Sequence, residues 1–342
     1  MPSALMELLR ARLVGFAREP EAVFWTFGFP VLIAVALGIA FRNKGPEKIY
    51  VAVVEQSGAG ELQQALSADD ALEVSRRDGA AANTELRTGK VSIVIEPGSV
   101  PTFRFDPTRP ESRVARLEVE AALDRAARRP APLVKQDAPV TQEGSRYIDF
   151  LVPGLIGMNL LSAAMFGIGW AMVEARGRKL LKRLAATPMP RSAYLGSYIL
   201  GHLVLSTAML VFVLAFARLA FGVHVFGSYL SVLFISLFGA ASFAGLSVLC
   251  ATRTENSEVY AGMSNAITLP MFVASGVFFS SGHFPDVIQP LIQILPLTAF
   301  IDALRAVMTD GATLFSQWPR LLILAIWGVL SFILALRWFR WN

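Results

Sequence analysis

The chain has 342 residues, of which 54% are hydrophobic and 17% charged, a balance that exceeds what a soluble core needs. The net charge of +5 is explained by the basic cytoplasmic loops of a membrane protein, so we expect no nucleic-acid partner. The single cysteine, Cys250, excludes an intrachain disulfide, and the three histidines lack the spacing of metal ligands. Several stretches of about 20 residues carry no charge, which predicts an integral membrane protein.

The N-terminal segment predicts an amphipathic helix that is followed at once by a first membrane span. Leucines and Phe16 fall on one face of this helix, with Glu7 and Arg10 opposite, as in helices that lie in the membrane interface. We assign residues 1–20 to a cytoplasmic interfacial helix and the uncharged residues 22–41 to span one. No small-residue cleavage site follows, so we expect this span to be retained as an anchor.

Residues 42–147 are polar overall and predict a small α/β domain rather than a linker. Strands are predicted over 49–54, 91–95 and 102–105, and helices over 60–66 and 110–129. Val114, Leu117 and Ala121 are predicted to form the buried face of the second helix. About 100 residues suffice for one modest core.

Residues 148–342 predict a transmembrane domain with five more spans. These spans cover about 150–173, 192–217, 229–251, 259–281 and 314–336. Between the fifth and sixth spans, Pro285, Pro290 and Pro296 divide apolar segments too short to cross, which predicts re-entrant or interfacial helices. The predicted fold is an α-helical polytopic membrane protein with six transmembrane helices.

The distribution of basic residues predicts which side of the membrane each part occupies. Lys and Arg gather in the N-terminal segment, in residues 174–191 and at the C-terminus, whereas the loop after span three has only Arg218. By the positive-inside rule both termini are cytoplasmic. We expect the domain 42–147 to be extracytoplasmic, because large domains are translocated regardless of their charge.

Residues 174–191 (EARGRKLLKRLAATPMPR) form a basic segment between two spans. Leu180, Leu181 and Leu184 form an apolar stripe at helical spacing, and Thr187-Pro188 ends the helix. The pattern indicates a helix that contacts a partner at the cytoplasmic surface. The alternative is a plain loop held against anionic lipid, although that requires no apolar stripe.

The order of these parts resembles the membrane subunit of type-2 ABC exporters, the type V exporter fold that also includes the G-subfamily pumps. The resemblance covers essentially the whole chain. Its most specific local signal consists of Glu174, Gly177, Leu180, Leu184, Thr187 and Pro188. Residues 296–298 (PLT), leading into Asp302, Leu304 and Arg305, are similar to the family's outer re-entrant helix.

This resemblance implies the permease subunit of an ATP-driven efflux transporter in the plasma membrane (the bacterial inner membrane). It also implies a homodimer, or a heterodimer with a similar subunit, with spans two and five near the interface. The chain has no G-x-x-x-x-G-K-[ST] phosphate loop, so we expect it not to be an enzyme and to bind no cofactor itself. ATP and Mg²⁺ would be bound by a separate ABC ATPase subunit.

The resemblance assigns residues 174–188 the role of a coupling helix that docks on the ATPase. The residues expected at this contact are Glu174, Arg178, Leu180, Leu181, Lys182, Arg183, Leu184, Thr187 and Pro188. The leucines would enter an ATPase groove and the basic side chains would pair with its acidic rim. Glu174 is expected either to cap the following helix or to pair with a basic residue of the same loop.

Spans two and five supply the candidates for a substrate path. They are Met158, Asn159, Met165, Phe166, Asn265, Met271, Phe272 and Phe278. Met and Phe adapt to varied apolar shapes, which favours an amphipathic or hydrophobic substrate such as a drug, lipid or peptide. The alternatives are interhelical hydrogen bonds for the two asparagines and ordinary packing for the others. Asp302 and Arg305, three residues apart, are expected to pair.

Two functions of other classes remain as alternatives. One is a membrane-anchored sensor or scaffold whose outer domain binds a ligand, and in either class residues 42–147 offer a surface to a periplasmic or cell-surface partner. The other is an ion-coupled secondary transporter, which normally needs acidic residues near the membrane midplane. No acidic residue lies clearly inside a predicted span.

Overall fold

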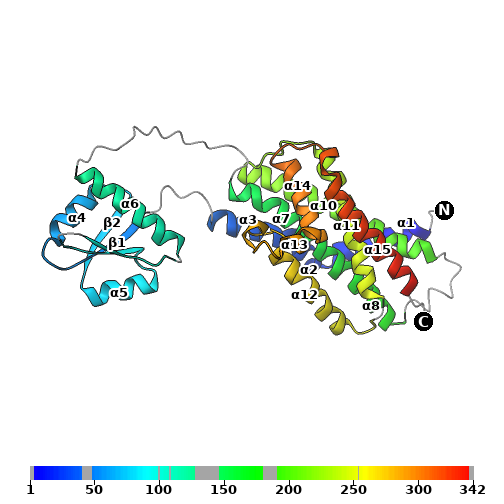
Figure 1. Cartoon of the computed structure of the whole chain (residues 1–342). Helices are drawn as coiled ribbons and strands as arrows, with labels where there is room; N and C mark the ends of the chain where they lie inside the picture. The colour runs from blue at the N-terminus through cyan, green and yellow to red at the C-terminus, as the bar shows by residue number, and fades with distance from the viewer. Residues whose placement is uncertain are drawn as a thin grey trace. The chain divides into compact units, whose positions relative to one another are not determined.

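The computed structural model describes residues 4–40, 48–98, 101–107, 109–127, 146–179, 191–252 and 254–338. They belong to two compact units (Figure 1). The smaller unit is Asn43–Pro139, and the larger unit combines Met1–Arg42 with Val140–Asn342.

The smaller unit is an α/β domain built on a four-stranded sheet of order β2-β1-β3-β4. Its strands are β1 (Ile49–Val54), β2 (Leu72–Arg77), β3 (Ile93–Glu96) and β4 (Thr102–Arg104), and its helices are α4 (Ala59–Ser67), α5 (Gly79–Thr88) and α6 (Pro110–Ala126). β1 pairs in parallel with β2 and β3, whereas β4 returns antiparallel to β3. Val51 and Val53 pack with α4 and α6, and Ala52 and Val54 pack with α5 on the other face. Burial on both faces explains why β1 is an unbroken apolar run.

All strands and helices predicted for this domain are confirmed, but two elements were not predicted. β2 has the polar sequence LEVSRR and lies at the edge of the sheet, so it lacks the apolar pattern of a central strand. α5 buries only Ala82 fully, and so small a side chain gives a weak helical pattern.

The prediction for the buried face of α6 is wrong. Val114 and Leu117 are 57% and 67% exposed, and Ala121 is exposed as well. The face against the sheet consists instead of the buried residues Ser112, Ala115, Val119 and Ala122. Three of these four side chains are small, which lets the helix lie close to the sheet, and Val114 and Leu117 face outward.

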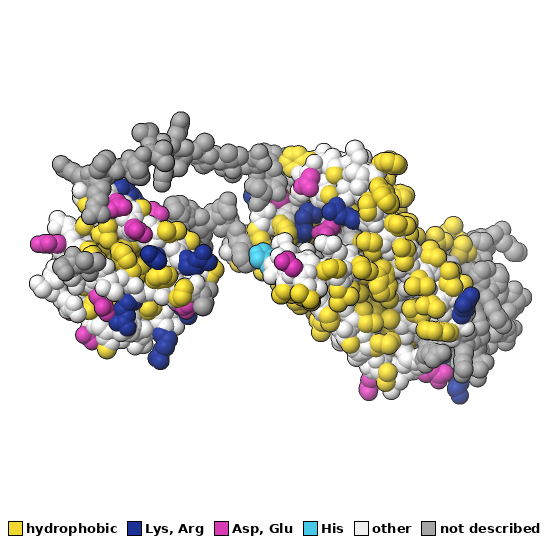
Figure 2. Space-filling view, viewed as in Figure 1, with side chains coloured by type: hydrophobic (Ala, Val, Ile, Leu, Met, Phe, Trp, Pro, Cys, Tyr) yellow, Lys and Arg dark blue, Asp and Glu magenta, His cyan; other side chains and the backbone are white. Residues whose placement is uncertain are grey.

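In the described part of the larger unit, all regular elements are helices. Its elements are α1 (Ala4–Arg18), α2 (Pro20–Val23), η1 (Phe24–Gly28), α3 (Phe29–Ala40), α7 (Tyr147–Ser162), η2 (Ala163–Gly169), α8 (Trp170–Gly177), α10 (Arg191–Phe221), α11 (Tyr229–Ala251), α12 (Ser257–Ala274), η3 (Ser281–His283), α13 (Gln289–Ile294), α14 (Pro296–Met308), η4 (Phe315–Gln317) and α15 (Trp318–Trp338). Hydrophobic side chains cover much of the face shown in Figure 2. The predicted N-terminal amphipathic helix is present as α1.

Among the described residues, five helical segments are long and apolar enough to cross a membrane. They are Pro20–Ala40, Tyr147–Gly177, Gly196–Phe221, Tyr229–Ala251 and Phe315–Trp338. The predicted fifth span, 259–281, is not among them. Its helix, α12, ends at Ala274 because Gly276 has a positive φ of 77°. Ser, Thr and Asn side chains also make α12 less apolar than the other five segments.

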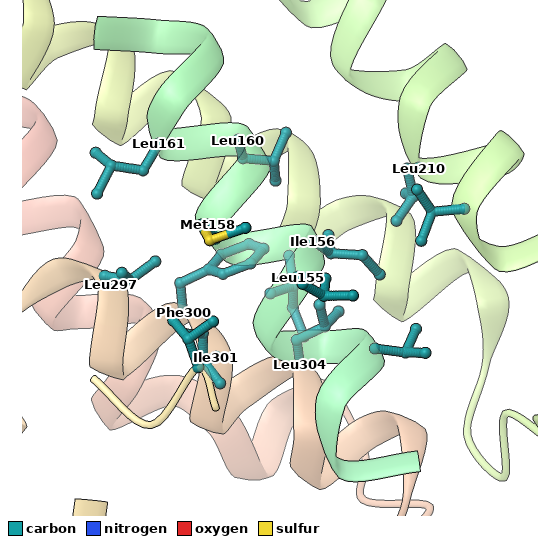
Figure 3. Packing of buried hydrophobic residues seen from close by; sticks show 14 of the residues in the cluster. Leu155, Ile156, Met158, Leu160, Leu161, Leu210, Leu297, Phe300, Ile301 and Leu304 are labelled. Atoms are coloured by element: carbon teal, nitrogen blue, oxygen red, sulfur yellow. The ribbon is translucent and has the colours of Figure 1, made fainter. Parts of the chain in front are cut away.

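The core of the larger unit lies where α14 packs between α7 and α11. Figure 3 shows Met158 of α7 directly against Phe300 of α14, and both side chains are buried. Gly157 permits this approach, since a Cβ there would meet Ile301 at 2.8 Å, and Gly239 of α11 faces the Phe300 ring. With 13 residues α14 rises only about 20 Å, which is too short to cross a bilayer. The predicted short helices of this region are therefore present as α13 and α14.

Candidate functional site

The second apolar segment ends in a turn that leads directly into the basic segment. α8 ends at Gly177, and Lys179 has a positive φ of 54°, which stops the helix. Of the predicted coupling residues, Glu174 and Arg178 are described, whereas Leu180, Leu181, Lys182, Arg183, Leu184, Thr187 and Pro188 lie outside the described residues. The chain is described again from α10 onward.

Arg176 joins the end of α8 to the end of α11. Its guanidinium Nη1 donates to the carbonyl oxygens of Ala251 and Thr252 at 2.8 Å and of Thr254 at 3.2 Å. These carbonyls lie at or just beyond the C-terminus of α11, where no following helical turn supplies donors. A cation is favourable at the negative end of a helix dipole, and Arg176 is only 6% exposed. The contact therefore fixes the two helix ends together.

Glu174 and Arg178 form an ion pair on the exposed side of the same turn. Their oxygen and nitrogen atoms are 2.7 Å apart, and the side chains are 44% and 77% exposed. An exposed pair four residues apart on a helix contributes about 0.3–0.5 kcal/mol. Of the two roles expected for Glu174, the geometry shows pairing with a basic residue of the same segment. The buried Arg176 is the stronger structural element of this turn.

A π-helix in the middle of the second apolar segment provides a second connection. In η2 the backbone leaves its regular α-helical pairing, and two carbonyl oxygens accept bonds from neighbouring helices. Ser247 of α11 donates to Ala164 at 2.6 Å, and Tyr260 of α12 donates to Met165 at 2.8 Å. Both hydroxyl groups are buried, so these bonds are well protected from competition by water.

Gly169 makes room for the Tyr260 hydroxyl. A Cβ at this position would overlap Tyr260 Oη and come within 2.6 Å of Ser247 Oγ. Only glycine therefore fits where η2 meets α11 and α12. Together, Arg176, Ser247 and Tyr260 fasten η2–α8, α11 and α12 into one unit, which we call the junction block.

The N-terminal helix is attached to the first turns after the basic segment. Arg12 of α1 donates from Nε to Ser197 Oγ at 3.0 Å. Its guanidinium also lies 2.9 Å from the centre of the Tyr198 ring. α1 therefore packs on α10 near the point where the chain returns from the basic segment.

Away from the junction block, at the start of α7 and the end of α12, Arg305 of α14 connects three elements. The predicted Asp302–Arg305 pair is confirmed, with 3.6 Å between the charged atoms. Arg305 also donates to the Gly276 carbonyl at 2.9 Å, and its guanidinium lies 3.8 Å from the Phe150 ring centre. Tyr147 donates to the Phe278 carbonyl at 2.9 Å beside it. The start of α7, the end of α12 and α14 are thus held together.

The structure separates the eight candidates for the substrate path into two groups. Met158, Asn159, Met165 and Met271 are buried, and Phe272 and Phe278 pack partly buried against the same core. Phe166, 39% exposed, and Asn265 lie on the surface of this chain. None of the eight lines the apolar groove on α10, which is formed by Val204, Thr207, Ala208, Val211, Phe212 and Ala215.

Sequence reasoning did not single out the residues of the junction block. Arg176 is one of several arginines in a basic stretch, and its burial depends on the end of α11, 75 residues later. Tyr260 and Gly169 carry no motif of their own. Among the described residues, no group of three or more His, Cys, Asp or Glu is placed to hold a metal ion.

The chain is similar to known proteins and to one protein family. The family model described as ABC-2 family transporter protein matches residues 21–337. Nodulation protein J of Bradyrhizobium diazoefficiens is 26% identical over 206 residues, which are 58% of this chain and 75% of that protein. The inner membrane transport permease YadH of Escherichia coli is 28% identical over 164 residues, 47% of this chain and 63% of that protein.

A eukaryotic protein is also similar to the chain. ABC transporter G family member 20 of Dictyostelium discoideum is 25% identical over 195 residues, or 56% of this chain. The chain spans about a quarter (26%) of the length of that protein. The family match covers nearly the whole chain, and five segments are apolar enough to cross a membrane. The chain therefore belongs to the ABC-2 family of transporter proteins and is a multi-pass membrane permease.

Proposed function

We propose that this chain is the permease subunit of an ATP-driven exporter in the plasma membrane, and that a separate ABC ATPase subunit binds ATP and Mg²⁺. The junction block is the observation that carries this proposal. Arg176 ties the end of α11 to the last turn of α8, where the chain enters the basic segment, and Ser247 and Tyr260 tie α11 and α12 to η2. A force applied to that segment therefore acts on three helices together.

Residues 174–188 form the contact with the ATPase in this proposal. Leu180, Leu181 and Leu184 enter an apolar groove, while Arg178, Lys182 and Arg183 face acidic residues at its rim. Closure of the ATPase on ATP displaces this segment, and Arg176 passes the displacement to α11. The helices then move as rigid bodies. Alternation of two packed arrangements opens the transport path toward the outside.

The same proposal places α12 across the membrane as a sixth span. Six spans put both termini in the cytoplasm and the α/β domain Asn43–Pro139 outside. Basic residues support this orientation, since Arg176, Arg178 and Lys179 cluster at one end of the second segment. α13 and α14 then lie at the outer side as re-entrant helices.

A second permease copy, identical or similar, would pack against spans two and five. α12 exposes Val259, Leu269 and Val273, which are 59%, 58% and 52% accessible. Asn265 is also exposed, and a Cβ at Gly262 would meet nothing within 4 Å. An exposed amide within a membrane span favours a protein neighbour over lipid, and glycine permits close helix contact. Phe166 and Asn265 would then line a path for an amphipathic or hydrophobic substrate between the copies.

Co-purification tests the proposed function. The tagged full-length chain is isolated from native membranes in mild detergent, and its partners are identified by mass spectrometry. We expect a protein with the G-x-x-x-x-G-K-[ST] loop to be recovered and the complex to hydrolyse ATP. The Leu180→Asp/Leu184→Asp variant should lose this partner, because two charges cannot enter an apolar groove.

The control is Leu180→Met/Leu184→Met, which keeps the apolar volume and should retain the ATPase. Recovery of no ATPase with the unaltered chain, or equal recovery with the Asp and Met variants, contradicts the proposal. Unchanged levels of the Asp variant in the membrane exclude loss of the permease itself as the cause.

A further inference from the structure

The outward face of α6 carries an apolar stripe that the domain does not use for its own core. Val114 and Leu117 are 57% and 67% exposed, and Pro110 and Ala121 are exposed beside them. With about 100° per residue, these four positions fall along one line of the helix. The buried side chains of α6 lie on its opposite face. An apolar stripe left outside a folded core indicates a protein contact.

Charged residues flank this stripe in an ordered way. Arg113 and Glu120 lie along one edge of it, one in each half of the helix, with Leu117 between them. Both side chains are exposed, and the described residues include no ion-pair partner for either. The neighbouring Arg125, by contrast, pairs with Asp69 and Glu118 within the domain.

This edge is complementary to itself when two α6 helices run antiparallel. A two-fold axis at Leu117 places Arg113, four residues before it, opposite Glu120 of the other copy, three residues after it. The symmetry forms the same ion pair twice. Leu117 then meets its own counterpart, and Val114 lies beside Ala121 of the other copy. A parallel arrangement would instead place both Arg113 side chains at one level of the interface and both Glu120 side chains at another, so neither ion pair would form.

We propose that α6 is a contact surface between the α/β domains of two copies of this chain, packed antiparallel about Leu117. The partner is a second copy because the apolar stripe and its charged edge are self-complementary. One helix pair buries less than the roughly 1,200–2,000 Å² of a free-standing complex. It suffices where two copies are already held in one transporter, since tethering gives effective concentrations of roughly millimolar. The inference therefore rests on the proposed function only for the presence of two copies.

Cysteine crosslinking in the full-length chain tests this contact. Cys250 is first replaced by Ala, and Leu117→Cys is introduced, so that two facing residues at the axis can form a disulfide. Ala81→Cys serves as the control, because Ala81 is exposed on α5, which covers the other face of the sheet. After mild oxidation we expect Leu117→Cys to give at least about fivefold more disulfide-linked dimer than Ala81→Cys.

Charge exchange in the Leu117→Cys background tests the antiparallel register. Arg113→Glu alone and Glu120→Arg alone each place like charges together twice, and each should lower the crosslinked fraction about fivefold. The double variant Arg113→Glu/Glu120→Arg re-forms both pairs and should return to within about twofold of the starting value. Circular dichroism and membrane levels verify that each variant is folded.

The oligomeric state of the solubilised chain, measured by light scattering, separates this inference from the proposed function. If the chain is dimeric but Leu117→Cys gives no more crosslinked dimer than Ala81→Cys, the α6 contact alone is overturned. Failure of the double variant to recover overturns the antiparallel pairing. A chain that is monomeric and still binds an ATPase overturns the contact while the coupling proposal stands.

Discussion

Arg176 Nη1 lies 2.8 Å from the carbonyl oxygen of Ala251, so one buried side chain connects the last turn of the second apolar segment to the last turn of α11. The residues that make this connection are 75 positions apart in the chain. Two more connections from η2, to Ser247 and Tyr260, lie deeper in the same bundle. Together they attach the end of the second segment, from which the chain continues into the basic residues, to α11 and α12.

Replacing Arg176 should destabilise the protein far more than replacing Arg178. Arg176→Met leaves the buried carbonyls at the end of α11 without their donor, at a cost of about 2–3 kcal/mol. Arg178→Met removes only the exposed pair with Glu174, worth about 0.5 kcal/mol. The melting temperature of each detergent-solubilised variant measures the difference. Equal melting temperatures for the two variants would show that Arg176 does not hold the junction together.

Gly169→Ala should destabilise the junction block by about 1–3 kcal/mol, because the added methyl overlaps the Tyr260 hydroxyl. Tyr260→Phe removes that hydroxyl, so the cost of Gly169→Ala should fall by at least about 0.5 kcal/mol in the Phe background. Gly167→Ala is the matched control, since nothing lies within 4 Å of its Cβ position. Thermal unfolding of the four variants completes the double-mutant cycle. Independent effects at the two sites would contradict the overlap.

The contact between Arg305 and Phe150 should be measurable by the same approach. Phe150→Leu keeps an apolar side chain but removes the ring over which the guanidinium lies. We expect a coupling free energy of about 0.5–2 kcal/mol between Phe150→Leu and Arg305→Met. A second double-mutant cycle combines Asp302→Asn with Arg305→Met. A coupling of zero with Phe150 would leave the ion pair as the main contact of Arg305.

The orientation of the chain can be tested with single cysteines in the Cys250→Ala background. A membrane-impermeant maleimide should label Ala81→Cys, in the α/β domain, on intact cells. It should label Arg178→Cys only after the membrane is permeabilised. The opposite pattern would reverse the topology, and labelling of both positions on intact cells would contradict the proposed span arrangement.

The sequence predicts the helices of the larger unit well because membrane helices must be continuously apolar. Charged residues accordingly mark the limits of the first two segments, at Glu21 and Arg42 and at Asp149 and Glu174. The end of α12 was placed seven residues too late, although Ser275-Gly276 is a turn signal. An apolar stretch continues beyond that turn, and apolarity alone does not show that the backbone has left the helix.

The α/β domain shows a different limit of sequence reasoning. On α6, helical spacing predicts a buried face of Val114, Leu117 and Ala121, and all three are exposed. The face against the sheet instead carries Ala115, Val119 and Ala122, two of which are small. Which face of a helix is buried depends on the space that the strands leave for it, and the sequence of the helix alone does not indicate that space.

The candidate site was predictable only in part. The sequence predicts that Glu174 either caps the following helix or pairs with a basic residue of the same segment, and the structure shows Arg178, four residues on, as its partner. The partners of Arg176, Gly169 and Tyr260 come from other helices, so their roles follow from tertiary packing alone. The π-helix η2 carries no charge, and its two glycines do not distinguish it from α7, which also contains two.

The π-helix has a consequence for the direction in which the basic segment leaves the bundle. A π-turn holds more residues than an α-turn, so every residue after Gly169 is rotated about the helix axis relative to a continuous α-helix. The angular positions of Glu174 and Arg176 are therefore set at η2, about two turns earlier, and not by the residues that follow them. Removing one residue within Ala163–Gly169 would turn Arg176 away from α11 while leaving the sequence of the basic segment unchanged. A change deep in the bundle can thus redirect the surface that the chain presents at its end.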